Sequence, residues 1–347
     1  MIDRKELKSR LSNLKAYSER SNKFFVIAIS SSVENTNDSY FGGIRKTARI
    51  VCMSIVNLSQ SEFQASVDLI DMYSDFIFVD AEKKCGFEIE DECNGKTNPL
   101  YSNLLAAAYQ RIDHNKVLPW SASRLTSDAA ICELRKRRGG NLSGHHMSLV
   151  GPGSIGFKVA HALVDEGAYV HIYDRQGSRG QCLISAINYT KSRFTIAAAI
   201  FTSSLDIAFA SSECVILSAS SRKYVTVRQL QLLPPGNTLV LDIGKDSLTL
   251  NSLEYIRANP SINYMRLDIG SQLMRTINSH LFRDEFECGT PQFVVRDSSG
   301  SGYVSGGYTG KAGDIVVDDA NQPTFQLGYI NTNGEFVSEF KIINEIT

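Results

Sequence analysis

The chain has 347 residues, of which 43% are hydrophobic and 21% charged, a composition typical of a folded globular protein and not of a disordered, collagenous or coiled-coil chain. Lysine and arginine (36) nearly balance aspartate and glutamate (37), which disfavours nucleic acid or an anionic membrane as a partner. At roughly 150 residues per domain, the length predicts about two domains.

The seven cysteines are an odd number and do not form the dense, even framework of a small secreted domain. They include no CxxC pair and no histidine at metal-ligand spacing, so we expect free thiols and no metal site. The charged start MIDRKELKSR differs from a signal peptide, and no apolar run approaches the roughly 18 residues of a membrane span. We therefore expect a cytoplasmic protein without a membrane partner.

The first part of the chain alternates helical and strand patterns, which is typical of α/β units with parallel strands. Residues 3–20 and 59–74 show helical spacing, whereas 24–30 and 75–81 are apolar runs that predict buried strands. Residues 45–57 fit either a helix or a strand. We expect an N-terminal α/β domain over residues 1–125.

The segment that leads to the second domain is harder to interpret. Residues 82–99 are charged and rich in turn formers, so we expect a surface loop there. A helix is predicted at 102–112, and a crossing loop at 117–123. The next helix, with Thr126 or Ser127 as its N-cap and Gly139 as its stop, is expected to bridge the two domains.

The sharpest signal is a glycine fingerprint between two apolar strands. The segment GPGSIG comprises Gly151, Pro152, Gly153, Ser154, Ile155 and Gly156. The first glycine permits a tight turn, the second permits a pyrophosphate to approach the backbone, and the third lets helix and strand pack closely. These features predict a Rossmann domain, a doubly wound parallel sheet that binds a dinucleotide, over residues 126–285.

The second strand of this unit ends at Asp174, 23 residues after Gly151, near the spacing expected of the acid that binds the adenosine ribose hydroxyls. The acid favours NAD over NADP because it repels a 2′-phosphate. Arg175 and Arg179 adjoin it and are able to clamp a phosphate, so NADP stays open as the less favoured cofactor.

Further apolar runs at 193–201, 214–220, 237–244 and 262–270 continue the predicted sheet. Ligands of such sheets bind at the carboxyl ends of the strands. That rule marks these residues as lining the crevice: Ser218, Ala219, Ser220, Asp242, Gly244 and Asp268. For Asp242 and Asp268 the alternative is helix capping or loop hydrogen bonding.

After residue 285, glycines and alternating apolar residues replace helical spacing, which predicts a β-rich C-terminal extension over 286–347. Asn333 and Gly334 are expected to form a tight hairpin turn. The predicted fold is thus α/β, with an N-terminal α/β domain, a Rossmann domain and a β-hairpin appendage.

Over roughly residues 24–285 the chain is similar to the amino-acid-dehydrogenase-like group that includes methylenetetrahydrofolate dehydrogenases, and it most resembles the pyrrolysine-biosynthesis dehydrogenases. The resemblance rests on the serines after FFVIAI and on FIFVDAE, VLPWSAS, SLVGPGSIG, VILSAS and MRLDIGSQLMRTI. It implies NAD-dependent oxidation of an amine, with hydride transfer between a carbon bearing nitrogen and the nicotinamide. The folate enzymes use a tyrosine and a lysine four residues later. Here Ile44 follows Tyr40 at that spacing, and a lysine comes only at Lys46.

Amine oxidation requires a carboxylate that orients the ammonium group and accepts its proton. The catalytic candidates are Asp80, Glu82 and Lys46, and the substrate-binding candidates are Ser31, Ser32, Trp120 and Asp268. A salt bridge of the two acids with Lys83 or Lys84, and capping by the serines, are the structural alternatives.

The function that the sequence favours is NAD-dependent oxidation or reduction of a small amine, amino acid or cyclic imine in a biosynthetic pathway. Two alternatives stay open, a redox-neutral cyclodeaminase or lyase that retains NAD, and a nucleotide-binding sensor without turnover. A homodimer is also left open.

Overall fold

The computed structural model describes residues 3–30, 39–56, 58, 60–82, 84–90, 97–220, 223–236, 238–281, 294–296, 302–305, 310–320 and 322–343. They fall into two compact units, Met1–Ile277 and Asn278–Thr347. The predicted domain boundaries near residues 125 and 285 stay a prediction, although each of the three predicted parts holds a main sheet of its own.

The first sheet belongs to the N-terminal part of the chain. Its strands are β1 (Phe24–Ile29), β2 (Tyr40–Phe41), β3 (Arg45–Lys46), β4 (Ile50–Val56), β5 (Phe76–Asp80) and β8 (Lys116–Trp120). The order is β2-β4-β1-β5-β8, with β3 also on β4. β4, β1, β5 and β8 run parallel, as predicted, whereas β2 and β3 are antiparallel to β4.

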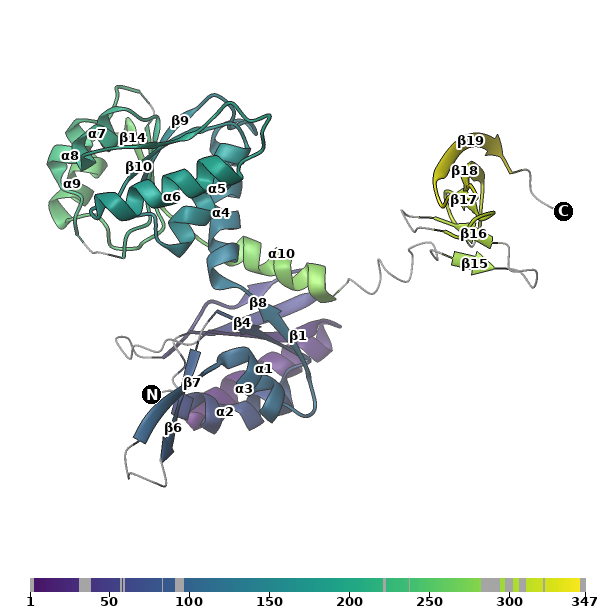
Figure 1. The fold of residues 1–347 in the computed structure, drawn as a ribbon. Helices are drawn as coiled ribbons and strands as arrows, with labels where there is room; N and C mark the ends of the chain where they lie inside the picture. Colours follow the sequence, from purple (N-terminus) through teal and green to yellow (C-terminus); the bar gives the residue numbers. More distant parts are fainter. Residues whose placement is uncertain are drawn as a thin grey trace. The chain divides into compact units, whose positions relative to one another are not determined.

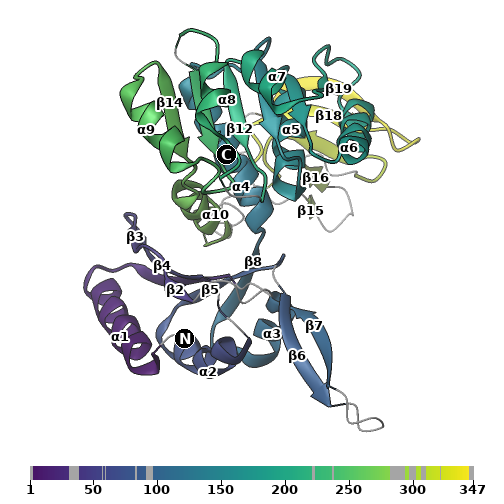
Figure 2. The same ribbon diagram turned by 90° about the vertical axis from the view of Figure 1, so that its left-hand side faces the viewer.

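Three helices cover one face of this sheet: α1 (Arg4–Arg20), α2 (Gln60–Tyr73) and α3 (Leu104–Arg111) (Figure 2). Leu7 and Leu11 of α1 pack with Phe63, Val67 and Ile70 of α2 in one buried cluster. The predicted helices at 3–20 and 59–74 are therefore confirmed, because apolar residues at helical spacing need a common apolar face to pack against.

The expected crossing loop at 117–123 is wrong, because β8 (Lys116–Trp120) leads directly into the helix α4 (Ala122–Arg137). The N-cap is Ser121, whose side chain accepts a hydrogen bond from the Arg124 amide, and not Thr126 or Ser127. Pro119 fits in the strand because β8 lies at the edge of the sheet, where a missing backbone donor costs no ladder bond. The helix ends before Gly139, as predicted.

The loop predicted at 82–99 is also wrong, because the segment forms most of a two-stranded hairpin. β6 (Lys84–Glu90) pairs antiparallel with β7 (Thr97–Asn103). The apolar positions Phe87 and Ile89 alternate with acidic ones, and this period of two is typical of a strand. The open choice at 45–57 is settled in favour of strands, β3 and β4.

The second sheet has the strand order β11-β10-β9-β12-β13-β14. Its strands are β9 (His146–Val150), β10 (Tyr169–Tyr173), β11 (Ala199–Phe201), β12 (Cys214–Leu217), β13 (Thr238–Asp242) and β14 (Ile262–Arg266). All neighbours are parallel, and in chain order the pattern is 3-2-1-4-5-6, that of the dinucleotide-binding Rossmann fold. The predicted doubly wound sheet is confirmed, although β11 is much shorter than the predicted strand at 193–201.

Helices cover both faces of this sheet (Figure 1). One face packs α4, α5 (Ser154–Asp165) and α6 (Gly177–Thr190), and the other packs α7 (Leu205–Ala210), α8 (Val227–Gln231) and α9 (Leu250–Ala258). Alternate residues of each strand enter the two clusters, as Leu149 and Val150 of β9 do. The last helix of this region is α10 (Gly270–Leu281). None of the described helices combines the length and apolar character needed to cross a bilayer.

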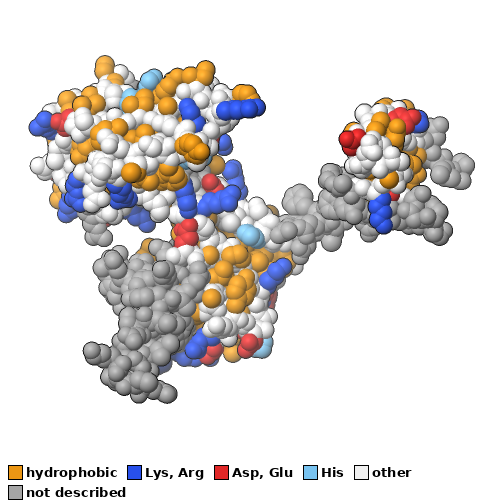
Figure 3. Space-filling view, viewed as in Figure 1, with side chains coloured by type: hydrophobic (Ala, Val, Ile, Leu, Met, Phe, Trp, Pro, Cys, Tyr) orange, Lys and Arg blue, Asp and Glu red, His pale blue; other side chains and the backbone are white. Residues whose placement is uncertain are grey.

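The C-terminal unit holds a sheet with the order β15-β16-β17-β18-β19. These strands are β15 (Val294–Arg296), β16 (Gly302–Val304), β17 (Ile315–Val317), β18 (Phe325–Ile330) and β19 (Phe336–Ile342). Gly334, with φ +78°, lies in the turn between β18 and β19, which confirms the predicted hairpin. Hydrophobic side chains remain exposed on the surface of this unit (Figure 3). They include Phe325 and Phe340, whose ring centres lie 5.6 Å apart.

Candidate functional site

The glycine loop joins β9 to α5 and is fixed by tight backbone packing. Gly151 has φ +83°, and a Cβ atom there would lie 2.6 Å from Ala219. A Cβ atom at Gly156 would overlap Ser218 Oγ and the Gly151 carbonyl. Larger residues at these positions would push the loop away from the end of β12, so both glycines are required by the fold itself.

Gly153 differs from the other two glycines of the loop, because a Cβ atom at this position would have no other atom within 4 Å. It is the N-cap of α5, and no side chain caps this helix. The amides of the first helical turn lack partners within the helix and carry the positive end of its dipole. A bare backbone beside open space is what a pyrophosphate needs in order to approach.

A cavity of about 890 Å³ surrounds this loop and has the size of a typical ligand site. It collects most of the predicted nucleotide-binding residues at the carboxyl ends of β9, β10, β12 and β13. Those that line it are Gly151, Gly153, Ser154, Ile155, Asp174, Arg175, Ser218, Ala219, Ser220 and Gly244. Gly156 and Asp242 do not line it.

Asp174 ends β10 with a carboxylate that is only 10% exposed. Its Oδ1 accepts a hydrogen bond from the Gln176 amide at 3.0 Å. Its Oδ2 is buried and has no hydrogen-bond partner among the described residues; the nearest cation, Arg179 Nε, is 3.8 Å away. A buried carboxylate oxygen without a donor is energetically unfavourable, and a ribose hydroxyl is a donor that would satisfy it.

Two other residues predicted to bind the ligand form hydrogen bonds within the protein. Ser218 Oγ donates to the Gly151 carbonyl at 2.6 Å and so holds the glycine loop. Asp242 is fully buried, and its carboxylate accepts from the Lys245 amide, from both donors of Ser247 and from the Tyr264 hydroxyl. The loop-bonding alternative for Asp242 is therefore the one that its geometry favours.

Sequence reasoning missed one wall of the cavity, formed by Lys223, Tyr224 and Lys245. Lys223, Lys245 and Asp246 have φ of +52°, +63° and +57°, a left-handed conformation that costs non-glycine residues energy and that clusters at functional sites. Burial raises the pKa of Tyr224 to about 12, so its hydroxyl stays a donor at neutral pH. Lys223 and Lys245 lie far apart in the sequence and form no recognisable motif, so the sequence does not predict that they line one cavity.

In the first sheet, Asp80 and Glu82 lie where β5 ends and α4 begins. Asp80 is buried, and its Oδ1 accepts from the amides of Glu82 and Ala122 at 3.1 and 3.3 Å. Glu82 accepts from Ser121 Oγ at 2.6 Å, from the amide and hydroxyl of Ser123 and from Lys158 Nζ of α5 at 3.2 Å. Among the described side chains, the ion pair of Glu82 is with Lys158. Lys83 and the side chain of Lys84, the partners considered from the sequence, lie outside the described residues.

These contacts set the charge of Glu82. Partial burial raises the pKa of its carboxyl group, but the hydrogen bonds from Ser121, Ser123 and Lys158 outweigh burial and lower that pKa to about 2. A carboxylate with such a low pKa is a weak base near neutral pH. The catalytic role of Glu82 stays a prediction, and its geometry favours a role in capping α4 and in an ion pair with α5.

Of the remaining candidates, those that the structure describes do not line this cavity. Lys46 Nζ lies 3.8 Å from the centre of the Tyr17 ring. Trp120 is buried beside Asp80 on β8, and its Nε1 has no hydrogen-bond partner among the described residues. Asp268 forms an ion pair with Arg45 at 3.3 Å and is 76% exposed. Ser31 and Ser32 lie outside the described residues. The roles assigned to these five residues stay predictions.

Comparisons with known proteins do not identify a family for this chain. No protein-family model matches the chain, and no curated protein matches it. Solved structures similar to the chain include dipicolinate synthase A chain from Bacillus subtilis (15% identity, 76% of this chain and 79% of that chain, TM-score 0.35). They also include D-mandelate dehydrogenase from Rhodotorula graminis (16% identity, 76% and 70%, TM-score 0.34).

The chain spans only part of some of these neighbours. It covers 39% of glutamyl-tRNA reductase from Methanopyrus kandleri, at 20% identity over 47% of this chain and a TM-score of 0.35. TM-scores this low establish no relationship, so the topology and the cavity carry the interpretation.

Proposed function

We propose that the chain is an NAD-dependent oxidoreductase that acts on a small amine, amino acid or cyclic imine. The observation that carries the proposal is the cavity at the switch point of a 3-2-1-4-5-6 sheet, with the bare backbone of Gly153 at one side and the unsatisfied Asp174 oxygen at another. Ligands of such sheets bind at this point.

The residues present fit a dinucleotide. Gly153 and the first turn of α5 would hold the pyrophosphate, and Asp174 would accept hydrogen bonds from the adenosine ribose. The buried negative charge of Asp174 would repel a 2′-phosphate, which is why we propose NAD before NADP. When bound, the nicotinamide supplies the hydride acceptor or donor.

The wall formed by Lys223, Tyr224 and Lys245 supports a substrate with a carboxylate, which among these classes favours an amino acid. Neither lysine makes an ion pair within the described residues, and both line the cavity of the glycine loop. The cationic side chains of this cavity, Arg175, Arg179, Lys223 and Lys245, outnumber its single acid, Asp174. We propose that the two lysines orient the substrate carboxylate and that the neutral Tyr224 hydroxyl donates to it.

The test is turnover of the full-length protein with NAD and a panel of amino acids, the corresponding decarboxylated amines, cyclic imines and 2-hydroxy acids. The absorbance of the reduced nicotinamide reports hydride transfer, and mass spectrometry reports the product. We expect reduction with amino acids and little with the decarboxylated amines. Product without net reduction would point to the redox-neutral lyase, and turnover of 2-hydroxy acids alone would contradict the proposed C–N bond.

The lysine wall is tested with Lys223→Met and Lys245→Met, and with Lys8→Met on the exposed face of α1 as the matched control. Loss of one of two ionic contacts is expected to raise KM about tenfold, which corresponds to about 1.4 kcal/mol, with a smaller change in kcat. Equal KM values in the three variants would show that the substrate does not use this wall.

A further inference from the structure

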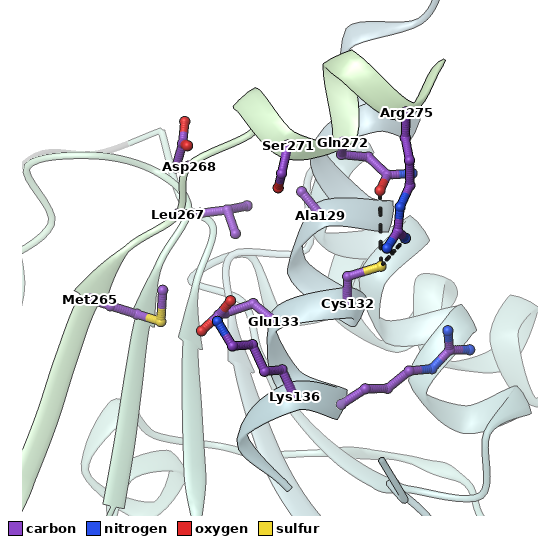
Figure 4. Close-up of a pocket in the computed structure, with 11 residues that line it drawn as sticks. Ala129, Cys132, Glu133, Lys136, Met265, Leu267, Asp268, Ser271, Gln272 and Arg275 are labelled. Carbon is purple, nitrogen blue, oxygen red and sulfur yellow. Dashed lines mark hydrogen bonds between the residues drawn. The ribbon is translucent and has the colours of Figure 1, made fainter. Parts of the chain in front are cut away.

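A second cavity and an apolar sheet face both lie outside the proposed dinucleotide site. The cavity, of about 520 Å³, lies between α4, the end of β14 and the start of α10 (Figure 4). Its charges have both signs, because Glu133 lies beside Lys136, and Arg275 Nη1 donates to Cys132 Sγ at 3.6 Å. The cavity therefore selects no single class of ligand.

The C-terminal sheet carries exposed apolar side chains on one face of its hairpin β18–β19. Along β18, exposed residues alternate with the buried Gly328 and Ile330, as the period of two of a strand requires. On β19, Ile342 lies opposite Phe325 in register, and the Phe340 ring stacks with that of Phe325. We call this surface the outer face, and its five residues are Phe325, Leu327, Tyr329, Phe340 and Ile342.

An apolar outer face is unusual for a sheet in contact with water. Antiparallel strands that are solvated on one side normally alternate apolar residues inside with polar residues outside. The inner face already forms a core, because Val304 and Ile330 are buried. The described residues after Leu281 form strands, turns and loops but no helix. Because a domain usually consists of two packed layers, the described part of this unit lacks a layer over the outer face.

The apolar area of the outer face matches what a stable dimer requires. Its five side chains are 37–67% exposed. Since a covered aromatic side chain buries about 150–250 Å², these fractions correspond to about 400–500 Å² of apolar surface per subunit. A standard interface buries about 800 Å² per partner, of which about 60%, or about 480 Å², is apolar.

The charges beside the outer face favour a second copy over a charged partner. Glu339 and Lys341 of β19 pair with each other at 2.5 Å, so this strand offers no net charge to nucleic acid, an anionic lipid or an acidic peptide. Where two β19 strands run antiparallel about a twofold axis, each Glu339 approaches the partner's Lys341. A pair of opposite charges is then complementary to itself, as an isologous interface requires.

We propose that the outer face is the interface of a homodimer, in which the outer faces of two copies pack together about a twofold axis. Phe340 and Ile342 contribute most of the buried area, because they are the most exposed of the five residues. No residue of the outer face lines the dinucleotide cavity, so this proposal is independent of the proposed function.

The test is sedimentation velocity of the full-length chain over about 0.1–100 μM, because interfaces of this size dissociate at micromolar concentrations or below. We expect a mass of two 38.3 kDa chains at the highest concentration. The variant Phe340→Asp/Ile342→Asp places unpaired charges in the interface and is expected to sediment as a single chain throughout. Leu250→Asp on α9 is the matched control, because it puts the same charge at an exposed apolar position of the larger unit, and it is expected to dimerise as wild type does.

A second variant removes apolar area without adding charge. Phe340→Thr/Ile342→Thr keeps residues that favour strands and is expected to weaken dimerisation at least about tenfold. Hydrogen exchange of β16 and β17, which carry neither substitution, verifies that the C-terminal sheet is folded in both variants.

Three results would overturn the proposal. They are a single chain at the highest concentration of wild type, a dimer of wild-type affinity in both outer-face variants, and equal weakening of the dimer by Leu250→Asp. None of them bears on hydride transfer, which turnover tests separately.

Discussion

The two main sheets of the larger unit both end in polar residues, but Glu82 of the first sheet is bonded differently from the Gly153 backbone and Asp174 of the second. Just after β5 in the first sheet, Glu82 accepts hydrogen bonds from the start of α4 and pairs with Lys158. At the ends of β9 and β10 in the second sheet, the Gly153 backbone faces open space and one Asp174 oxygen has no donor among the described residues.

This difference shows which polar groups remain for a ligand. A group whose hydrogen bonds are already satisfied gains little by binding, whereas a buried group left unsatisfied gains the free energy of the missing bond. The comparison therefore supports the ligand site proposed at the second sheet and an architectural role for Glu82 of the first.

The largest effect is expected at Gly151, where the loop has no room. Gly151→Ala combines a left-handed backbone with a Cβ atom 2.6 Å from Ala219, so we expect a loss of about 3 kcal/mol in unfolding free energy. Gly139→Ala is the matched control, because Gly139 has φ +66° and no neighbour within 4 Å of its Cβ position. It is expected to lose only about 1 kcal/mol. Urea denaturation measures both, and equal losses would show that close packing does not hold the loop.

The next effect concerns cofactor choice. Asp174→Asn removes the charge that opposes a 2′-phosphate and leaves Arg175 and Arg179 beside it, so NAD binding is expected to weaken about tenfold, or about 1.4 kcal/mol, while NADP binding holds or tightens. Calorimetry with both nucleotides measures the ratio, with Asp165→Asn on α5 as control. An unchanged ratio would mean that Asp174 does not select the cofactor.

A smaller effect concerns Glu82, whose pKa is about 2 in the folded chain. Because the folded pKa lies below the unfolded value, the stabilisation is fully present above about pH 4.5 and is lost as the pH falls toward 2. Its side chain is 35% exposed, and solvent screening reduces the contribution to about 1 kcal/mol. Denaturation of wild type and Glu82→Gln between pH 6 and about 3 should show the difference shrink. A constant difference would contradict the ion-pair role.

The smallest effect is expected at Asp268. Its pair with Arg45 is exposed, and Asp268→Asn keeps an acceptor for the Gly270 amide, which now donates at 3.0 Å. We expect less than about 0.5 kcal/mol in stability. Turnover is the second readout, because a large rise in KM would support the substrate role predicted for this residue.

Patterns that reflect burial were readable from the sequence. The apolar runs of β1, β5, β9 and β13 and the GPGSIG loop specify the parallel sheets, because strands buried on both faces require continuous apolar residues. The wrong secondary-structure predictions concern segments whose conformation depends on tertiary contacts. Pro119 hid β8 because its position at the sheet edge, which makes proline tolerable, is not a local property.

The residues of the candidate site show the same difference between features that local sequence determines and features that tertiary contacts determine. Glycines at a strand–helix junction have a steric cause that the sequence carries, so the loop was predictable. The partners of Glu82 come from α4 and α5, and the wall of Lys223 and Lys245 depends on the backbone angles of two separate loops. Contacts between segments that are distant in the sequence produce no local residue pattern, so they could not be predicted from the sequence.

The central claim is that a dinucleotide lies against the bare backbone of Gly153, and one calorimetric titration tests it. Gly153→Ala places a Cβ atom in open space at an ordinary φ of −70°, so its unfolding free energy should stay within about 1 kcal/mol of wild type. NAD should bind wild type saturably at one site and bind this variant at least tenfold more weakly. The absence of NAD binding to wild type, or equal affinity for the two proteins, would contradict the claim.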